Sequence, residues 1–161
     1  MTGKSAKFSI SFLEKEIDFF LARGYTTTTW SVRVKMWSKV ERGEGMYGKY
    51  KHTLDAKGRL FVPAKLREEL GASFYVAQGA DTCLTVYTEE EWQKLLEKFA
   101  SMPSSRTRHM RSFFANVHKC EPDKQGRILL PESMRNYAKI KQDVVFIGLA
   151  TRAEIWSAEL Y

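Results

Sequence analysis

The chain contains the same nine-residue pattern twice, and this duplication is the strongest constraint on its fold. The segment DAKGRLFVP occupies residues 55–63, and DKQGRILLP occupies residues 123–131. Both segments share an Asp, a Gly-Arg pair, apolar residues and a closing Pro, all in register. The offset of 68 residues also joins Arg67 to Arg135, and it becomes 69 farther along the chain. This agreement indicates an internal duplication with one residue inserted after the first helix.

Each copy predicts a small ββαβ-like unit. In copy one, YKHTL is followed by a turn in which Gly58 can adopt a positive φ angle, and RLFV is a short apolar strand. Pro63 is expected at the first position of the helix PAKLREEL, which Gly71 ends. Copy two repeats this order with RILL, Pro131 and the helix PESMRNYA. The strands FYVAQG and CLTVY complete copy one, and VVFIG and AEIW complete copy two.

One such unit is too small to bury a core by itself. Two copies related by a pseudo-twofold axis are therefore expected to pack their apolar faces together. The expected fold is mainly β with helices, in the α+β class. The residues that this packing is expected to bury are Leu60, Phe61, Val62, Pro63, Ile128, Leu129, Leu130 and Pro131.

The segment between the copies predicts a helical hairpin. We expect the first repeat over residues 46–92, the hairpin over 93–117 and the second repeat over 118–161. Thr88 is a candidate N-cap, with Glu91 three residues later as in a capping box. Each predicted helix is apolar along one stripe, which packs either on its own chain or on a neighbouring subunit. The stripe residues are Trp92, Leu95, Leu96, Phe99, Met110, Phe113, Phe114 and Val117.

Residues 1–45 have no counterpart elsewhere in the chain. The segment FSISFLEKEIDFFLARG predicts one amphipathic helix ended by Gly24. The run ERGEG ahead of Met46 can be encoded almost wholly by purines, as a bacterial ribosome-binding site is. We therefore expect residues 1–45 to be a leader ahead of a natural start at Met46, with a loosely packed extension as the alternative. In a leader, Trp30 and Trp37 would be TGG triplets of promoter DNA, and the intact mass of natively expressed protein tests this expectation.

The charge permits an anionic partner without requiring one. The formal net charge is +7 and the isoelectric point is about 9.4, which favours nucleic acid or a membrane surface. Residues 1–45 hold eight Lys or Arg and five Asp or Glu, a balance of +3, which leaves +4 for residues 46–161. No stretch is long enough to cross a bilayer and no signal peptide is evident, so a cytoplasmic protein is expected.

The residue types do not favour a metal site or an enzyme. Cys83 and Cys120 are too few for a disulfide framework or a structural zinc site. The three histidines, which show no metal-ligand spacing, are His52, His109 and His118. There is no Ser-His-Asp grouping and no phosphate-binding Gly-rich loop. His52 near Asp55 is the only candidate dyad, and it is more simply explained as a strand residue beside a turn.

Each repeated turn combines an Asp, an Arg four residues later and an added Lys. These residues are Asp55, Lys57 and Arg59 in the first loop, and Asp123, Lys124 and Arg127 in the second. An exposed Asp-Arg pair across a turn is worth about 0.2–1 kcal/mol and would need no further function. Alternatively, pseudo-symmetry would put both basic loops on one side of the molecule, where arginine suits phosphate contact or bidentate recognition of guanine. The residue types alone leave both interpretations open.

The segments YKHTLDAKGRLFVPAKLREELG, CLTVYTEEEW and CEPDKQGRILLPESMRNYAKI resemble the MraZ family of bacterial DNA-binding regulators. The resemblance covers residues 46–161. The two halves of MraZ-family proteins belong to the AbrB-like, swapped-hairpin (SpoVT-AbrB) group. The resemblance implies a double-psi-type β-barrel made from both repeats and a homo-oligomeric ring. It also implies binding to G-rich direct repeats in double-stranded promoter DNA of the protein's own division and cell-wall operon, most commonly as a repressor, at the nucleoid.

The resemblance also implies roles for the loop residues. Arg59 and Arg127 would contact DNA, and the aspartates would orient them. The full implied set is Asp55, Lys57, Gly58, Arg59, Asp123, Lys124, Gly126 and Arg127. Copy two has Gln125 where copy one has Lys57, so the first loop is expected to contribute more. No catalytic residue, metal, cofactor, membrane or small-molecule substrate is implied. The alternative is a ring-forming interaction scaffold, which would show no sequence-selective, salt-dependent DNA binding.

Overall fold

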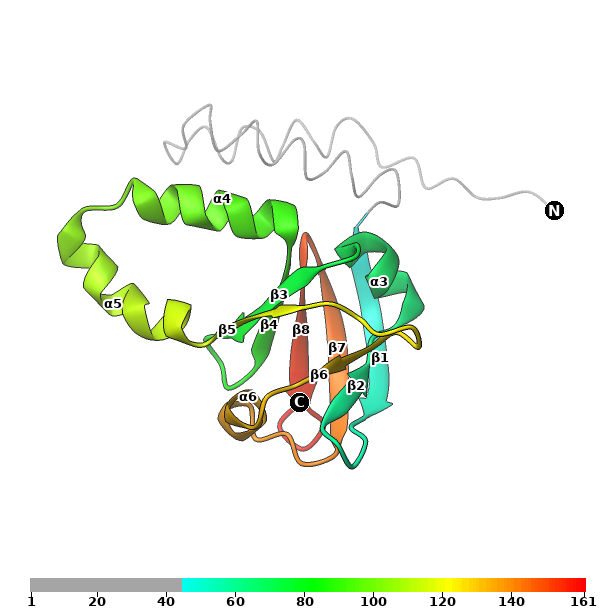
Figure 1. The fold of residues 1–161 in the computed structure, drawn as a ribbon. Coiled ribbons are helices and arrows are strands. Elements are labelled where there is room, and N and C mark those ends of the chain that lie inside the picture. The colour runs from blue at the N-terminus through cyan, green and yellow to red at the C-terminus, as the bar shows by residue number, and fades with distance from the viewer. Residues whose placement is uncertain (1–44) are drawn as a thin grey trace, which may run out of the picture. The chain divides into compact units, whose positions relative to one another are not determined.

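The computed structural model describes residues 45–161, and Figure 1 shows how their elements are arranged. Copy one contains β1 (Met46–Thr53), β2 (Arg59–Phe61), α3 (Ala64–Leu70), β3 (Phe74–Gln78) and β4 (Leu84–Thr88). The connecting helices are α4 (Glu89–Ala100) and α5 (Ser104–Ala115). Copy two contains β5 (Val117–Cys120), β6 (Arg127–Leu129), α6 (Glu132–Tyr137), β7 (Asp143–Ala150) and β8 (Arg152–Ser157). This content confirms the expected α+β class. The expectations for residues 1–44, including a helix ended by Gly24, lie outside the described part of the chain.

The two copies are arranged symmetrically within one antiparallel sheet. Its six strands lie in the order β1-β7-β8-β4-β3-β5, and β2 and β6 form a separate two-stranded ribbon. Because β5, β7 and β8 are the counterparts of β1, β3 and β4, the order is unchanged when the copies are exchanged. Each first strand pairs with the other copy, β1 with β7 and β5 with β3. Each copy therefore depends on the other to complete its part of the sheet.

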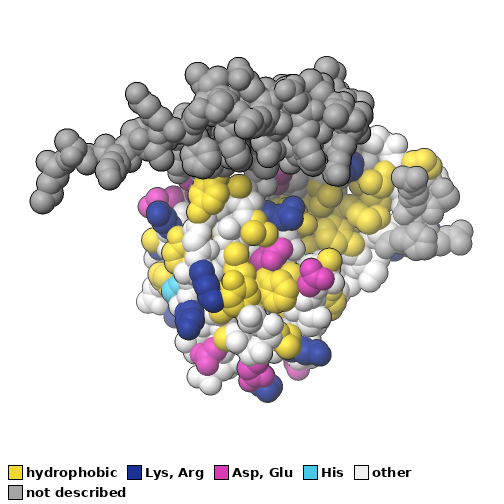
Figure 2. Space-filling view, turned by 180° about the vertical axis from the view of Figure 1, so that it is seen from behind, with side chains coloured by type: hydrophobic (Ala, Val, Ile, Leu, Met, Phe, Trp, Pro, Cys, Tyr) yellow, Lys and Arg dark blue, Asp and Glu magenta, His cyan; other side chains and the backbone are white. Residues whose placement is uncertain are grey.

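The surface on one side of the molecule is chemically mixed. Figure 2 shows Lys and Arg interspersed with Asp and Glu and with hydrophobic side chains on this face. The positive charge is not gathered there into one continuous area. The formal charge of the chain therefore does not mark a binding site on this face.

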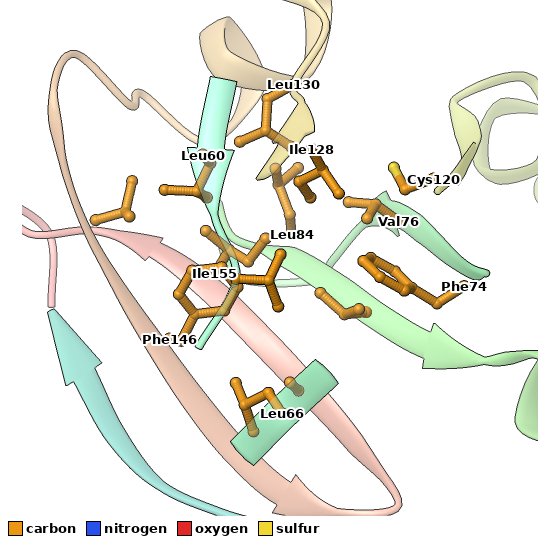
Figure 3. Packing of buried hydrophobic residues seen from close by; sticks show 14 of the residues in the cluster. Leu60, Leu66, Phe74, Val76, Leu84, Cys120, Ile128, Leu130, Phe146 and Ile155 are labelled. Atoms are coloured by element: carbon orange, nitrogen blue, oxygen red, sulfur yellow. The ribbon is translucent and has the colours of Figure 1, made fainter. Parts of the chain in front are cut away.

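Residues from both copies form one hydrophobic core. Figure 3 shows Leu60 and Ile128 of the ribbon in the same cluster as Leu84 and Ile155 of the six-stranded sheet. Val62 and Leu130, which directly follow the ribbon strands, are also fully buried. Burying an aliphatic side chain of this size contributes about 1.5–3 kcal/mol. The expected packing of the two copies against each other is thus present.

Two residues of the expected core are on the surface instead. The side chain of Phe61 is 38% exposed and that of Leu129 is 61% exposed. The prediction that they are buried was wrong because the ribbon is covered on one face only. Side chains alternate between the two faces of a strand, so the neighbours of Leu60 and Ile128 point away from the core.

The helices α3 and α6 begin one residue later than expected. Pro63 and Pro131 precede the helices, because their ψ angles of 135° and 149° are extended and not helical. Gly71 ends α3 as predicted, with a φ of 79° and an N–H that donates to the carbonyl of Arg67. Its counterpart Lys139 adopts a φ of 52° after α6, so both copies turn through the left-handed region at this point.

The base of the helical hairpin packs on its own chain. Thr88 caps α4 as predicted, since its hydroxyl accepts the N–H of Glu91 at 3.2 Å. The ring of Trp92 stacks on Tyr75 of β3 with centroids 4.8 Å apart, and lies 5.8 Å from that of Phe114 on α5. The two helices span residues 89–115, whereas the hairpin was expected over 93–117. The boundaries of the repeats themselves stay predictions.

The two longest helices within residues 45–161 have 12 residues each. None of the described helices has the length and apolar character required to cross a bilayer.

Candidate nucleic-acid interface

The loop after β1 is closed by Asp55. Its side-chain oxygen Oδ1 accepts the backbone N–H groups of Lys57 and Arg59, each at 2.9 Å. The backbone closes the same turn, because Gly58 N–H donates to the Asp55 carbonyl at 3.0 Å and Asp55 N–H donates to the Arg59 carbonyl at 2.9 Å. Gly58 has a φ of 76°, in the region that side chains disfavour. The loop is therefore a defined structure with an aspartate acceptor at its centre.

The loop before β6 has the same geometry. Asp123 Oδ1 accepts the N–H groups of Gln125 and Arg127, again at 2.9 Å. Gly126 N–H donates to the Asp123 carbonyl at 2.8 Å, and the φ of Gly126 is 77°. The replacement of lysine by Gln125 thus leaves the backbone unchanged, because the position contributes its N–H to the turn and its side chain to the surface.

The second oxygen of each aspartate binds the arginine four residues later. Arg59 Nε donates to Asp55 Oδ2 at 2.6 Å. Arg127 Nε donates to Asp123 Oδ2 at 2.9 Å, and its Nη2 lies 2.8 Å from the same oxygen. One carboxylate therefore shapes the turn and orients the guanidinium. This geometry accommodates both interpretations of the motif, the pair across a turn and the oriented arginine.

These hydrogen bonds lower the pKa of both aspartates from the ordinary value of 3.8. The backbone N–H of Arg127 is the main cause at Asp123, followed by its side chain, and the pKa falls to about 2. At Asp55 the pKa is also lowered, mainly by the backbone N–H of Arg59. Both carboxylates are thus ionised at neutral pH, and each places a negative charge next to the arginine of its own loop.

The two loops are joined directly across the pseudo-twofold axis. Val62 N–H donates to the Gly126 carbonyl at 2.9 Å, and Leu130 N–H donates to the Gly58 carbonyl at 3.0 Å. Between these bonds, β2 and β6 pair antiparallel, with Leu60 opposite Ile128. Since Leu60 and Ile128 point into the core, Arg59 and Arg127 lie together on the opposite face of the ribbon. The structure thus brings the two predicted arginines onto one surface.

The lysines are placed less symmetrically. Lys57 and Lys124 are both exposed, but Lys57 stands two residues before Arg59 and Lys124 three residues before Arg127. Their counterparts in the other copy are Gln125 and Ala56. Each loop thus presents one added cation at a different point, which preserves the charge and not the position.

A second pair of arginines supports the loops and was not predicted as part of the site. A Cβ atom on Gly58 would lie 3.2 Å from Cζ of Arg135, and one on Gly126 would lie 2.6 Å from Cζ of Arg67. The arginine on the helix of each copy therefore lies with its guanidinium over the loop glycine of the other copy. The Nε atoms of Arg67 and Arg135 are buried, and no described residue accepts a hydrogen bond from them. In the sequence, Arg67 and Arg135 are separated by the 68-residue offset of the repeat. That separation indicated the duplication, but it did not show that the two arginines lie over the loops.

His52 belongs to the packing and not to a dyad with Asp55. Its ring lies 5.5 Å from that of Phe61 and 6.0 Å from that of Phe146, and burial lowers its pKa. The carboxylate of Asp55 is engaged by the turn and by Arg59. Both cysteines are buried free thiols, and burial raises the pKa of Cys120 to about 11. Among the side chains that the structure describes, no three of His, Cys, Asp or Glu are grouped as metal ligands would be.

Comparison with protein families identifies the family to which this chain belongs. A family model described as "MraZ protein, putative antitoxin-like" matches residues 46–111 and 113–161, and each matched segment contains one of the loops. The chain belongs to the MraZ family. The recognition based on the paired Asp-Arg motifs is thus confirmed.

Relatives in the MraZ family match over most of their length. One named "Transcriptional regulator MraZ", from Carboxydothermus hydrogenoformans, is 50% identical over 117 residues, covering 71% of this chain and 82% of that protein. Another of that name, from Thermoanaerobacter sp. (strain X514), is 49% identical over 119 residues, covering 72% and 83%. A third, from Heliobacterium modesticaldum, is 50% identical over 115 residues, covering 70% and 80%. These relatives are named as transcriptional regulators and not as enzymes.

Proposed function

We propose that this protein is a sequence-specific DNA-binding regulator of transcription that reads DNA with Arg59 and Arg127. The observation that carries the proposal is the placement of both arginines on one face of the β2–β6 ribbon, each held by an aspartate of its own loop. The major groove admits a two-stranded ribbon, and arginine recognises guanine there through two hydrogen bonds. Membership in the MraZ family, whose relatives are named transcriptional regulators, supports the same function.

The other loop residues have supporting roles in this proposal. Asp55 and Asp123 hold the arginine side chains in a fixed orientation, which reduces the entropy cost of binding DNA. Gly58 and Gly126 keep the turns in their positive-φ conformation. Lys57 and Lys124 contact phosphates, a contribution that depends on salt and not on base sequence. The exact position of each lysine matters less for phosphate contact than for base contact.

We further propose that the chain assembles into a ring that binds G-rich direct repeats in the promoter of its own division and cell-wall operon, as a repressor. One subunit offers few phosphate contacts, so its binding would be weak and salt-sensitive. Several subunits on evenly spaced repeats gain effective concentration without new contacts. The hairpin supplies a surface for assembly, since Leu95, Leu96 and Met110 stay only partly buried.

The proposed fold at finer detail is a swapped-hairpin, double-psi-type β-barrel built from two SpoVT-AbrB repeats over residues 46–92 and 118–161. The exchange of first strands between the copies supports it, since β1 pairs with β7 and β5 pairs with β3. A protein of this kind would act at the nucleoid, in the cytoplasm.

Fluorescence anisotropy tests the proposed function. The full chain is titrated into a labelled duplex from just upstream of the Met46 codon and into a scrambled duplex, at two salt concentrations. Selective binding of the native duplex, weakened by salt, is expected. Equal binding to both duplexes that disappears at higher salt would contradict sequence recognition. No binding at either salt concentration would favour the alternative, a ring-forming scaffold for other proteins.

A further inference from the structure

The ribbon face that carries the arginines also carries two apolar side chains. In the β2–β6 register, Arg59 lies opposite Leu129 and Arg127 lies opposite Phe61. All four residues alternate with Leu60 and Ile128, which are buried at 0% and 2% exposure. The outward face therefore consists of two cross-strand pairs, each joining an arginine to an apolar residue of the other copy. This arrangement follows from the duplication, because Leu129 is the counterpart of Phe61.

Phe61 and Leu129 are both among the exposed large hydrophobic residues of the described part of the chain. Leu129 is the most exposed of the large hydrophobic residues in the described part of the chain. Phe61 is positioned by its neighbours, since its ring lies 5.5 Å from that of His52 and 5.2 Å from the guanidinium of Arg67. Single exposed apolar residues need no explanation. Two at equivalent positions, each across from a DNA-contacting candidate, indicate that the face is covered when the protein is bound.

The chemistry of the major groove matches this face. Guanine presents two acceptors there, which suit arginine, and thymine presents its C5-methyl group, the one apolar contact point. Aromatic and aliphatic side chains contact that methyl. Each arginine is paired with an ionised aspartate, and the exposed Lys57 and Lys124 leave the two loops with a net positive charge. This charge favours an anionic occupant, which argues for DNA over a second copy of this basic chain.

We propose that Phe61 and Leu129 are specificity-determining residues that contact thymine methyl groups next to the guanines bound by Arg59 and Arg127. The proposal rests on the proposed function, since it takes the ribbon face as the DNA-contacting surface. It deepens that function by giving the recognised sequence a second component. Guanine is read by hydrogen bonds, and thymine is read by apolar contact from the opposite strand of the ribbon.

Replacing thymine by uracil in the duplex tests the proposal, because deoxyuridine lacks only the C5-methyl group. The full chain is titrated into the native promoter duplex and into the same duplex with every dT replaced by dU. We expect binding to weaken by about fourfold for each methyl that a ribbon residue covers. Leu129→Ala should bind the dT duplex more weakly than the unchanged protein does. Its affinity for the dT duplex divided by its affinity for the dU duplex, the dT/dU ratio, should also be smaller. Phe61→Ala should behave in the same way.

The matched control is Arg59→Ala, which should weaken binding to both duplexes and leave the dT/dU ratio near that of the unchanged protein. Leu129→Ala is the decisive variant, because truncating such an exposed side chain leaves the core intact. Equal binding of dT and dU duplexes by the unchanged protein would overturn the proposal. An unchanged dT/dU ratio in Leu129→Ala, with an altered subunit number, would assign the face to subunit contact and also overturn it. Failure of the proposed function is distinguishable, because the unchanged protein would then not prefer the native over the scrambled duplex.

Discussion

The carbonyl oxygen of Gly58 accepts a hydrogen bond from the backbone N–H of Leu130 at 3.0 Å, so the turn of one copy is tied to the strand end of the other. The counterpart bond joins Val62 to Gly126 at 2.9 Å. Arg135 and Arg67 then cover the same two glycines from the helices of the opposite copies. The two loops therefore form one unit, and damage to either is expected to affect both.

Replacing Gly126 by Ala should destabilise the protein by more than its backbone conformation alone explains. A left-handed φ costs a non-glycine residue about 1–2 kcal/mol. The new Cβ would also lie 2.6 Å from Cζ of Arg67 and displace the guanidinium. In a double-mutant cycle by chemical denaturation, Arg67→Ala should relieve part of this cost, with a coupling of at least about 0.5 kcal/mol.

Gly71→Ala is the control for that cycle. Gly71 also has a positive φ, of 79°, but a Cβ there has nothing within 4 Å. Its cost should therefore come from the backbone conformation alone and be smaller than that of Gly126→Ala. Simple additivity of Gly126→Ala and Arg67→Ala would show that the guanidinium does not hold the loop.

The lowered pKa values of the aspartates predict that the stability of the protein falls at low pH. Because the pKa of Asp123 falls from 3.8 to about 2 on folding, its contribution is complete above pH 3.8 and disappears as the pH falls toward 2. Asp123→Asn keeps an acceptor oxygen and removes the charge. The melting temperature of the variant should be lower than that of the unchanged protein at pH 6, and the difference should shrink between about pH 4 and pH 2. A difference that stays constant over this range would contradict the role of the charge.

The asymmetry of the lysines predicts unequal loops. Lys57→Gln gives copy one the residue that copy two has as Gln125. It should weaken binding to native and scrambled duplexes equally and reduce the slope of log K against log salt by about 0.9 for each phosphate that is no longer neutralised. Gln125→Lys should have the opposite effect. A change in selectivity between the two duplexes would instead place Lys57 at a base edge.

The packing of the hairpin on its own sheet predicts a large effect at Trp92. This side chain is buried between β3 and α5, so Trp92→Ala should lower the free energy of unfolding by about 3–5 kcal/mol. Lys94→Ala on the same helix removes only exposed ion pairs with Glu90 and Glu91, worth about 0.2–1 kcal/mol. Similar, small effects of both changes in denaturant titrations would mean that the hairpin does not depend on this packing.

Local patterns predicted the elements of this fold but not how the copies share them. Asp55, Gly58 and Gly71 carry local turn and cap signals, and the structure places them accordingly. The pairing of β1 with β7 could not be predicted, because a strand pattern does not say which copy supplies its partner.

The candidate site was predictable where a residue belongs to a local motif and was missed elsewhere. Arg59 and Arg127 lie in a recognisable motif, and the structure brings them together on the ribbon. The run RILL is apolar after its arginine, so the sequence did not reveal that Leu129 points outward. Arg67 sits in an ordinary helical pattern, and its position over Gly126 depends on the packing between the copies.

The most direct test of the account is the affinity of the full-length Arg59→Ala, Arg127→Ala variant for the promoter duplex, measured by anisotropy. Its matched control is Arg111→Ala, Arg152→Ala, which removes two exposed arginines from α5 and β8. Each bidentate contact is worth about 1–3 kcal/mol, so the loop variant should bind at least about 30-fold more weakly, while the control stays within about threefold. Equal reductions in both variants would reduce the interaction to general charge attraction. Unchanged binding by a folded loop variant would contradict the assignment of the paired loops as the DNA-reading surface.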